Sequence, residues 1–182
     1  RHTIGEVELG VNYVLIISTN AGLWAYNIGD TVQFTSLKPY RIIVSGRIKH
    51  FISAFGEHVI AKEVESALQE ATENTEVRVN EFTVAPQINP ISGLPFHEWF
   101  IEFENEPNNL EEFALKIDKA MRNQNAYYDD LIVGKVLRTL IVSKVPKNGF
   151  QDYMKSIGKL GGQNKLPRLS DNREIADKLG RE

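Results

Sequence analysis

The hydrophobic pattern of this chain changes character near Ser45-Gly46, and that change limits the folds open to it. Before this point, short apolar and β-branched runs at 11–18, 23–28, 31–35 and 40–44 alternate with turn residues. After it, the apolar residues between 64 and 71 recur at i, i+3, i+4 and i+7, the spacing of one helical face. The pattern predicts an all-β segment followed by an α+β segment.

The second segment alternates predicted helices and strands. Strand-type alternation covers 76–84 and 98–104, where Glu98, Glu102 and Glu104 are expected opposite the apolar face. Asn109 is placed to cap a helix, with Glu112 in the capping-box position. A strand over 136–143 and a short helix over 151–160 follow. We therefore expect an α+β fold: a small antiparallel β subdomain, then a domain with helices on one face of a central antiparallel or mixed sheet.

Composition excludes several functions. The 182 residues include 21 Lys and Arg against 24 Asp and Glu, a formal net charge of -3 that disfavours nucleic-acid binding. No apolar run approaches the roughly 20 residues that cross a membrane. The absence of cysteine excludes disulfides, thiolate nucleophiles and zinc-thiolate sites, and it fits a cytoplasmic location. The four scattered histidines predict no metal site, because zinc needs three or four protein ligands.

Four short stretches, in order along the chain, suggest nucleotide chemistry. They are Tyr26–Asp30, with the pattern Tyr-x-x-Gly-Asp, then 46–65, 145–150 and 162–168. An Asp that follows Gly at a strand end can accept hydrogen bonds from both hydroxyls of a ribose. Taken singly, each stretch is also typical of a surface turn with solvated charges. Their joint order is what favours function.

The stretch Gly-Arg-x-Lys-x-x-Ile-x-x-x-Gly-Glu over 46–57, followed by Glu-Val-Glu over 63–65, resembles the hinge segment of adenylate-forming enzymes. That superfamily includes acyl-CoA synthetases, luciferases and the adenylation domains of peptide synthetases. Within it, Tyr-x-x-Gly-Asp and the ending Gln-Asn-Lys-Leu-Pro-Arg over 163–168 resemble the auxin-responsive family of acyl-acid amido synthetases. The resemblance runs from Gly22 to about Leu169.

The resemblance implies roles for individual residues. Tyr26, Asp30 and Arg47 match positions that bind ATP or AMP, with Asp30 at the ribose hydroxyls. Lys49 matches the hinge about which a C-terminal lid domain rotates. Lys165 matches the mobile lysine that neutralises the α-phosphate and the acyl carboxylate. Lys147, in Pro-Lys-Asn-Gly over 146–149, partly resembles the lysine motif usual in the superfamily and stays as the alternative.

The implied reaction has two steps. A carboxylic acid reacts with ATP and Mg2+ to give an acyl-adenylate and pyrophosphate, and an amine, expected to be an amino acid, then forms the amide. Residues 1–45 would end the large N-terminal adenylating domain and 46–182 would be the mobile C-terminal domain. The superfamily's phosphate loop and acyl pocket precede this region, and the chain begins at Arg1 instead of Met. We therefore expect a piece of a longer ligase that is inactive alone.

Two alternatives stay open at this point. A coenzyme A ligase of the same superfamily would share the hinge and the ribose aspartate. A non-catalytic, ferredoxin-like module that binds a ligand or regulates would share the order of helices and strands.

Overall fold

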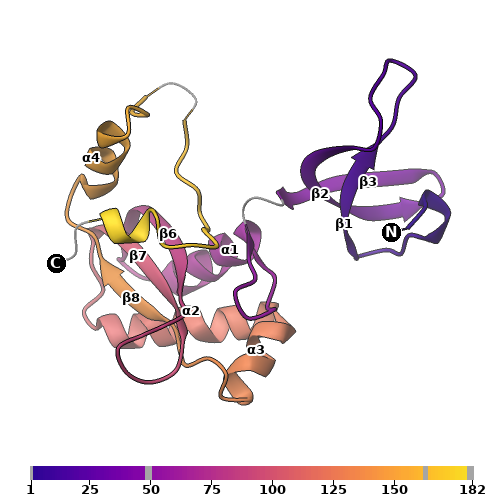
Figure 1. Ribbon diagram of the computed structural model, residues 1–182. Coiled ribbons are helices and arrows are strands. Elements are labelled where there is room, and N and C mark those ends of the chain that lie inside the picture. The colour runs from indigo at the N-terminus through magenta and orange to yellow at the C-terminus, as the bar shows by residue number, and fades with distance from the viewer. Residues whose placement is uncertain (1, 48–50, 162–163, 180–182) are drawn as a thin grey trace. The chain divides into compact units, whose positions relative to one another are not determined.

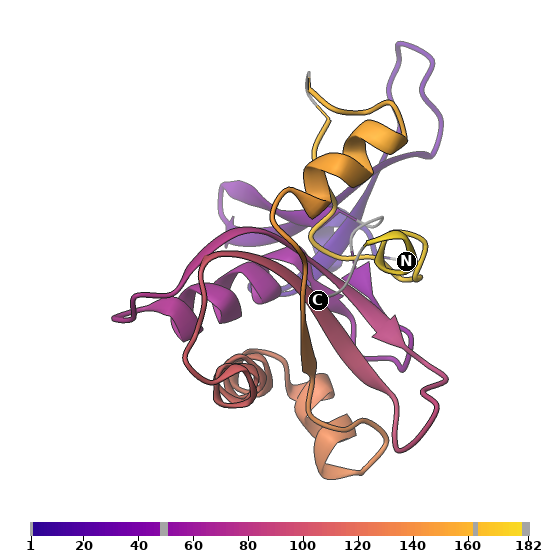
Figure 2. The ribbon, with the colours of Figure 1, turned by 90° about the vertical axis from the view of Figure 1, so that its left-hand side faces the viewer.

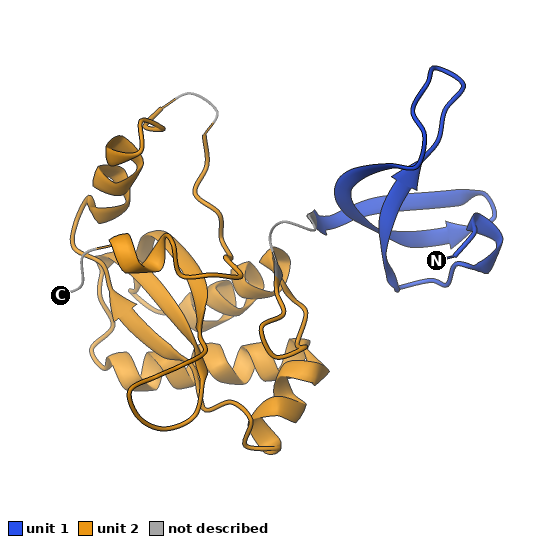
Figure 3. Ribbon diagram, viewed as in Figure 1, with its two compact units in different colours: residues 1–49 blue, residues 50–182 orange. Residues whose placement is uncertain are grey.

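The computed structural model describes residues 2–47, 51–161 and 164–179. The chain divides into two compact units, 1–49 and 50–182 (Figure 3). The predicted domain boundary at 45–46 lies close to this division and stays a prediction. Each unit is described by itself.

The first unit is an antiparallel sheet of β1 (Asn12–Ile17), β2 (Tyr26–Leu37) and β3 (Tyr40–Arg47), in the order β1-β2-β3, preceded by the 3-10 turn η1 (Ile4–Glu6) (Figure 1). Its small core contains Val32 and Phe34, and the Phe34 ring lies edge-on 6.0 Å from the ring of Tyr13 and 6.0 Å from that of Tyr40. The predicted small antiparallel sheet is confirmed. The predicted strand end at Gly29-Asp30 is wrong, since β2 runs through both residues.

The second unit has the predicted α+β order. Its elements are β4 (Phe51–Ile52), β5 (Val59–Ile60), α1 (Ala61–Thr72), β6 (Arg78–Gln87), β7 (Phe96–Asn105), α2 (Leu110–Gln124), α3 (Ala126–Val133), β8 (Ile141–Lys144), α4 (Gly149–Ser156) and η2 (Ala176–Lys178). The α2 cap is confirmed, because Asn109 Oδ1 accepts from the backbone N–H of Glu111 and Glu112. Helix α3 was not predicted, and the last strand begins only at Ile141.

The central sheet of the second unit is mixed. Strands β6 and β7 pair antiparallel, from Arg78 opposite Asn105 to Gln87 opposite Phe96, whereas β7 and β8 pair parallel. A parallel pair needs a crossover connection. Helices α2 and α3 supply it between β7 and β8 (Figures 1 and 2).

Both faces of this sheet are covered. Trp99 and Ile101 pack with the buried faces of α1 and α2, whereas Phe100 points to the opposite face and packs with Phe150 of α4 and with Leu166. The prediction that helices cover only one face of the sheet was therefore incomplete. Glu98 and Glu102 lie on this second face as the alternation predicted, yet they are buried instead of solvated.

The C-terminal segment docks along the free edge of β6. The N–H of Val84 donates to the carbonyl of Arg168 at 3.0 Å, and the N–H of Ser170 donates to the carbonyl of Val84 at 2.9 Å. These bonds form a parallel bridge between Val84 and Leu169, whose side chain is buried in the main core. Residues 168–170 are thus joined to the edge of β6 by an isolated β-bridge.

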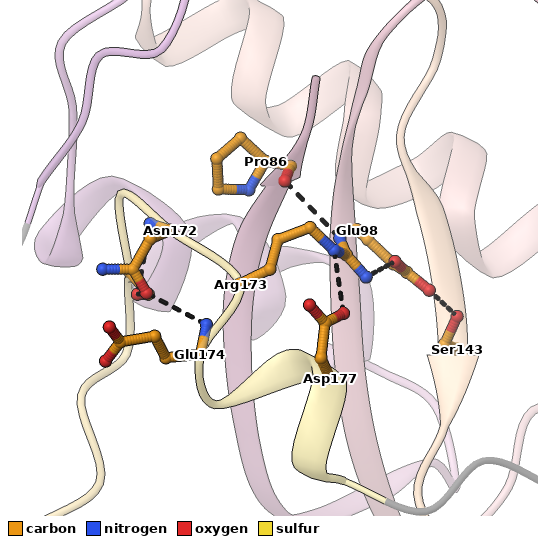
Figure 4. Close-up of polar contacts among 8 residues, drawn as sticks. Pro86, Glu98, Ser143, Asn172, Arg173, Glu174 and Asp177 are labelled. Atoms are coloured by element: carbon orange, nitrogen blue, oxygen red, sulfur yellow. Dashed lines mark hydrogen bonds and ion pairs between the residues drawn. The ribbon is translucent and has the colours of Figure 1, made fainter. Parts of the chain in front are cut away.

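Arg173 attaches the last turn to the second face of the sheet (Figure 4). Its Nη2 lies 2.8 Å from Glu98 Oε2 and its Nε lies 3.1 Å from Asp177 Oδ1. Glu98 Oε1 also accepts from the hydroxyl of Ser143 at 2.6 Å. A buried carboxylate is tolerated when it is paired and hydrogen-bonded, so Arg173 is the reason Glu98 can be covered.

A second buried pair fixes the loop that precedes α1. His97 Nε2 and Glu57 Oε1 are 2.8 Å apart, and both side chains are almost fully buried. Glu57 Oε2 also accepts from the N–H of Phe55 at 2.8 Å. Burial alone would raise the pKa of Glu57, but the hydrogen bond and charge of His97, together with backbone N–H groups, hold that pKa below its ordinary value of 4.5.

The pair belongs to a network that joins four elements. Asn125 Nδ2 donates to the Glu57 carbonyl at 3.1 Å and to Glu63 Oε2 at 3.1 Å. The His97 ring stacks on Tyr128 at 5.2 Å, and the Tyr128 hydroxyl donates to Asp118 Oδ1 at 2.7 Å. Burial, followed by the charge of Asp118, raises the pKa of Tyr128 well above its ordinary value, so this phenol stays a neutral donor.

We expect Glu57→Gln to lower the free energy of unfolding at pH 7 by about 2 kcal/mol, since it removes a buried charged partner of His97. A carboxylate with a depressed folded-state pKa contributes stability above its unfolded pKa and loses it as pH falls through the folded one. The difference between the wild-type chain and the variant should therefore begin to close as the pH falls below the ordinary carboxyl pKa of 4.5, and it should shrink further at lower pH. Urea unfolding from pH 3 to 8 measures it.

Glu104→Gln is the matched control, since Glu104 is exposed on β7. It should change stability by less than about 0.5 kcal/mol at any pH. A Glu57→Gln deficit that stays constant from pH 8 to pH 3 would contradict an ionised Glu57 in the folded chain.

Candidate functional site

The Tyr-x-x-Gly-Asp motif lies on a β-bulge. Val14 of β1 is opposite Thr31, but Ile16 is opposite Asn27, so β2 carries additional residues between these pairs. Gly29 has φ +82, a conformation that glycine adopts without strain, and its N–H donates to Asn27 Oδ1 at 2.9 Å. Bulges redirect side chains and are frequent beside active sites. The motif is therefore a distortion inside a strand.

The strand register brings two predicted nucleotide residues together. Asp30 of β2 is the direct partner of Arg47 of β3. Asp30 is half-buried, and Tyr26, at the start of β2, is 50% exposed. Sequence spacing alone did not reveal that Asp30 and Arg47 are cross-strand neighbours. Of the predicted hinge segment, Lys49 lies outside the described residues.

The end of the hinge motif has a structural role in the second unit. Gly56, with φ +94, closes a turn in which its N–H donates to the carbonyl of Ser53 at 3.4 Å. The next residue, Glu57, is the buried partner of His97. Glu57 belongs to the motif found in the sequence, but its pairing with His97 could not be predicted, because the two residues are 40 positions apart and no local pattern connects them.

Lys165 is exposed at the start of the docked segment. Directly after it, Leu166 is buried in the second core, and the carbonyl of Pro167 accepts from the Thr83 hydroxyl at 2.8 Å. Residues 166–170 are thus attached to the sheet, while the Lys165 side chain extends from the last residue before that attachment.

A cavity of about 690 Å³ adjoins Lys165. Its walls come from α1, β6, β7, α4 and the C-terminal segment, and they include one or more residues of three sequence motifs: Glu65, Asn148, Lys165 and Arg168. Three acidic and three basic side chains line it, namely Glu65, Glu81, Glu102, Lys159, Lys165 and Arg168. An exposed ammonium beside such a cavity can approach a phosphate or a carboxylate.

The Pro-Lys-Asn-Gly stretch forms a tight turn into α4. Asn148 has φ 66, and its N–H donates to Glu102 Oε1 at 3.1 Å. A Cβ on Gly149 would lie 2.5 Å from Val145 Cγ1, so this position requires glycine. Lys147 is exposed on this turn. The turn has a structural explanation that does not depend on a catalytic role for Lys147.

Arg168 engages two of the acidic residues in the cavity wall. Its guanidinium pairs with Glu81 through Nη1, and its Nε lies 3.3 Å from Glu65 Oε1. The guanidinium also lies over the Phe82 ring at 4.7 Å. The motif residues after Lys165 therefore act as an anchor.

Two kinds of feature are absent from the described residues. No group of three or more His, Asp or Glu side chains in this part of the chain is arranged to hold a metal ion. Within the same residues, no helix combines the length and apolar composition that a membrane span requires.

The chain is similar to acyl-acid amido synthetases along most of its length. It is 28% identical to indole-3-acetic acid-amido synthetase GH3.3 of Arabidopsis thaliana, over 91% of this chain and 30% of the relative. It is 26% identical to indole-3-acetic acid-amido synthetase GH3.10 of the same plant, over 97% of this chain and 31% of the relative. The chain thus spans about a third of these relatives.

A solved structure shares the fold. The GH3.15 acyl acid amido synthetase superposes with a TM-score of 0.72 at 21% identity, covering 97% of this chain and 34% of that one. The structure of AtGH3.15 acyl acid amido synthetase in complex with 2,4-DB superposes with a TM-score of 0.69 at 20% identity, covering 96% of this chain and 33% of that one. Residues 2–47 match the GH3 family central domain, and residues 62–174 match the GH3 family C-terminal domain. The chain therefore belongs to the GH3 family, whose relatives named above are amide-forming ligases.

Proposed function

We propose that this chain is the C-terminal part of an ATP-dependent ligase that adenylates a carboxylic acid and transfers the acyl group to the amine of an amino acid. Family membership and the names of the relatives support an amide-forming ligase. The observation that carries the proposal is the position of Lys165, an exposed cation beside a cavity and directly before an anchored segment.

The nucleotide site of the proposal is in the first unit. The Asp30 carboxylate accepts hydrogen bonds from the two ribose hydroxyls, and the bulge at Gly29 directs it. Arg47, the partner of Asp30 in the strand register, is the second residue assigned to the nucleotide, and Tyr26, at the start of β2, is the third. Mg2+ would be bound chiefly through the ATP phosphates, as is usual for this ion at nucleotide sites.

Lys165 acts in the first half-reaction. A carboxylate that attacks the α-phosphate brings two anions together, and a cation delivered at that moment stabilises the developing charge. Lysine is a compact charge on a long stem, which suits such contact. Lys49 is the proposed hinge about which the mobile domain, 46–182, rotates between the two half-reactions, and 1–45 is the proposed end of the N-terminal domain.

The remaining machinery is proposed to lie in an N-terminal domain of the same chain. The acyl pocket and the phosphate loop belong there, consistent with a chain that spans 30% of GH3.3. The acceptor distinguishes this proposal from the alternative ligase: an amine gives an amide, whereas coenzyme A gives a thioester. The relatives' names favour the amide.

In the full-length enzyme, Lys165→Ala should slow acyl-adenylate formation about 100-fold or more, because it removes a charge that acts in the transition state. Amide formation from preformed acyl-adenylate should change less than threefold. Pyrophosphate exchange and single-turnover aminolysis measure the two steps. Lys147→Ala is the matched control and should leave both steps within about threefold.

Equal loss in both half-reactions would contradict the role given to Lys165. A larger loss of adenylation in Lys147→Ala than in Lys165→Ala would transfer that role to Lys147.

Asp30→Asn in the full-length enzyme should weaken AMP binding about tenfold, because charge-assisted hydrogen bonds to the ribose are lost. The loss for 2′,3′-dideoxy-AMP should be under twofold, since that analogue has no ribose hydroxyls to bind. Calorimetric titration gives both constants, and Asp171→Asn, at an exposed site, is the control. Equal weakening of binding for both nucleotides would show that Asp30 does not bind the ribose hydroxyls.

The 182-residue chain alone should release no pyrophosphate above background from ATP with a panel of aryl and alkyl carboxylates. The reason is that the proposed acyl pocket and phosphate loop are elsewhere. Turnover that depends on one carboxylate and is abolished by Lys165→Ala would overturn this expectation.

A further inference from the structure

Arg168 lies three residues after Lys165 and pairs with two carboxylates of the wall that Lys165 also lines. We propose that Arg168 is a positioning residue: by pairing with Glu65 and Glu81, it keeps these carboxylates from capturing the Lys165 ammonium. This inference rests on the proposed role of Lys165 in adenylation.

Each acidic residue of the cavity wall has an assigned partner. Glu102 accepts from the N–H of Asn148 at 3.1 Å and from Asn80 Nδ2 at 3.4 Å. Glu65 and Glu81 are engaged by Arg168. Among the contacts of the described residues, the carboxylates beside Lys165 are thus hydrogen-bonded or ion-paired with residues other than Lys165.

An arginine suits this position better than a lysine. The planar guanidinium presents several N–H donors, so it can pair with Glu65 of α1 and Glu81 of β6 at once and still lie over the Phe82 ring. A single ammonium has no planar face to stack in this way. Arg168 therefore neutralises two carboxylates from two different elements.

The docking of the segment does not depend on the guanidinium alone. The Arg168 carbonyl accepts from Val84 N–H, the Ser170 N–H donates to the Val84 carbonyl, and Leu169 is buried. Truncation of the Arg168 side chain leaves these interactions in place. It instead leaves Glu65 and Glu81 without their cation, next to the flexible ammonium of Lys165.

Rescue separates this role from a purely structural one. In the full-length enzyme, Arg168→Ala should slow adenylation about fivefold, the size expected when a lysine is held by partly exposed carboxylates. In the triple variant R168A/E65Q/E81Q, the adenylation rate should recover to within twofold of wild type, although the ion pairs of Arg168 with Glu65 and Glu81 are absent. R168K should fall between them, and E65Q/E81Q alone should stay within twofold.

A second readout needs no activity and uses the 182-residue chain. Acylation of the Lys165 amine by an amine-reactive ester, followed by peptide mass spectrometry, should slow two- to fivefold in R168A and recover in the triple variant. Exposed Lys119 on α2 is the internal control and should not change.

The outcomes are distinct. A triple variant as slow as R168A in both assays would make Arg168 an anchor only and overturn the inference. If Lys165→Ala does not slow adenylation, the proposed function fails, while the labelling experiment still decides whether Arg168 keeps Lys165 free. If R168A does not fold, the same comparison of R168K with R168K/E65Q/E81Q decides.

Discussion

The pairing of residues 168–170 with the edge of β6 is the interaction on which the C-terminal arrangement depends. Two backbone hydrogen bonds to Val84 fix the segment, and its two leucines enter different cores: Leu169 the main core and Leu166 the core on the other face of the sheet. One short stretch of chain therefore contributes to the hydrophobic cores on both faces of the sheet. It also determines the position on the protein surface from which the Lys165 side chain extends.

Buried charges explain how the remaining parts are held. Glu98 is paired with Arg173, and Glu57 is paired with His97. In both cases the charged residue would be costly to bury alone, so each pair specifies one arrangement of the elements it joins. The first attaches the last turn to the sheet, and the second attaches the end of the hinge motif to β7. The proposed mobile lysine thus extends from a rigidly specified domain.

Much of the fold could be predicted because local pattern and tertiary burial agree. The apolar face of α1 and the cap at Asn109 are examples. Prediction failed where they disagree. Gly29-Asp30 has turn chemistry but lies in a bulge within β2, and α3 has apolar residues around its circumference instead of along one face. Glu98 alternates as a surface residue should, but the distant Arg173 makes its burial possible.

The candidate site divides in the same way. Motif resemblance could identify Asp30, Arg47 and Lys165 one at a time. It could not show that Asp30 and Arg47 are cross-strand partners, nor that Glu65 and Arg168, 103 positions apart, meet in one cavity wall. Such contacts follow from strand register and from the docking of the C-terminal segment, which no local spacing records.

Amide hydrogen exchange of the 182-residue chain, read residue by residue by NMR, tests the docking of the C-terminal segment most directly. We expect slow exchange for Val84 and Ser170, whose N–H groups join β6 to the docked segment, and fast exchange for exposed Lys165. Protection that begins at Leu166 would place Lys165 at the boundary of the anchored chain. Fast exchange at both Val84 and Ser170 would contradict the docking, and with it the position of Lys165.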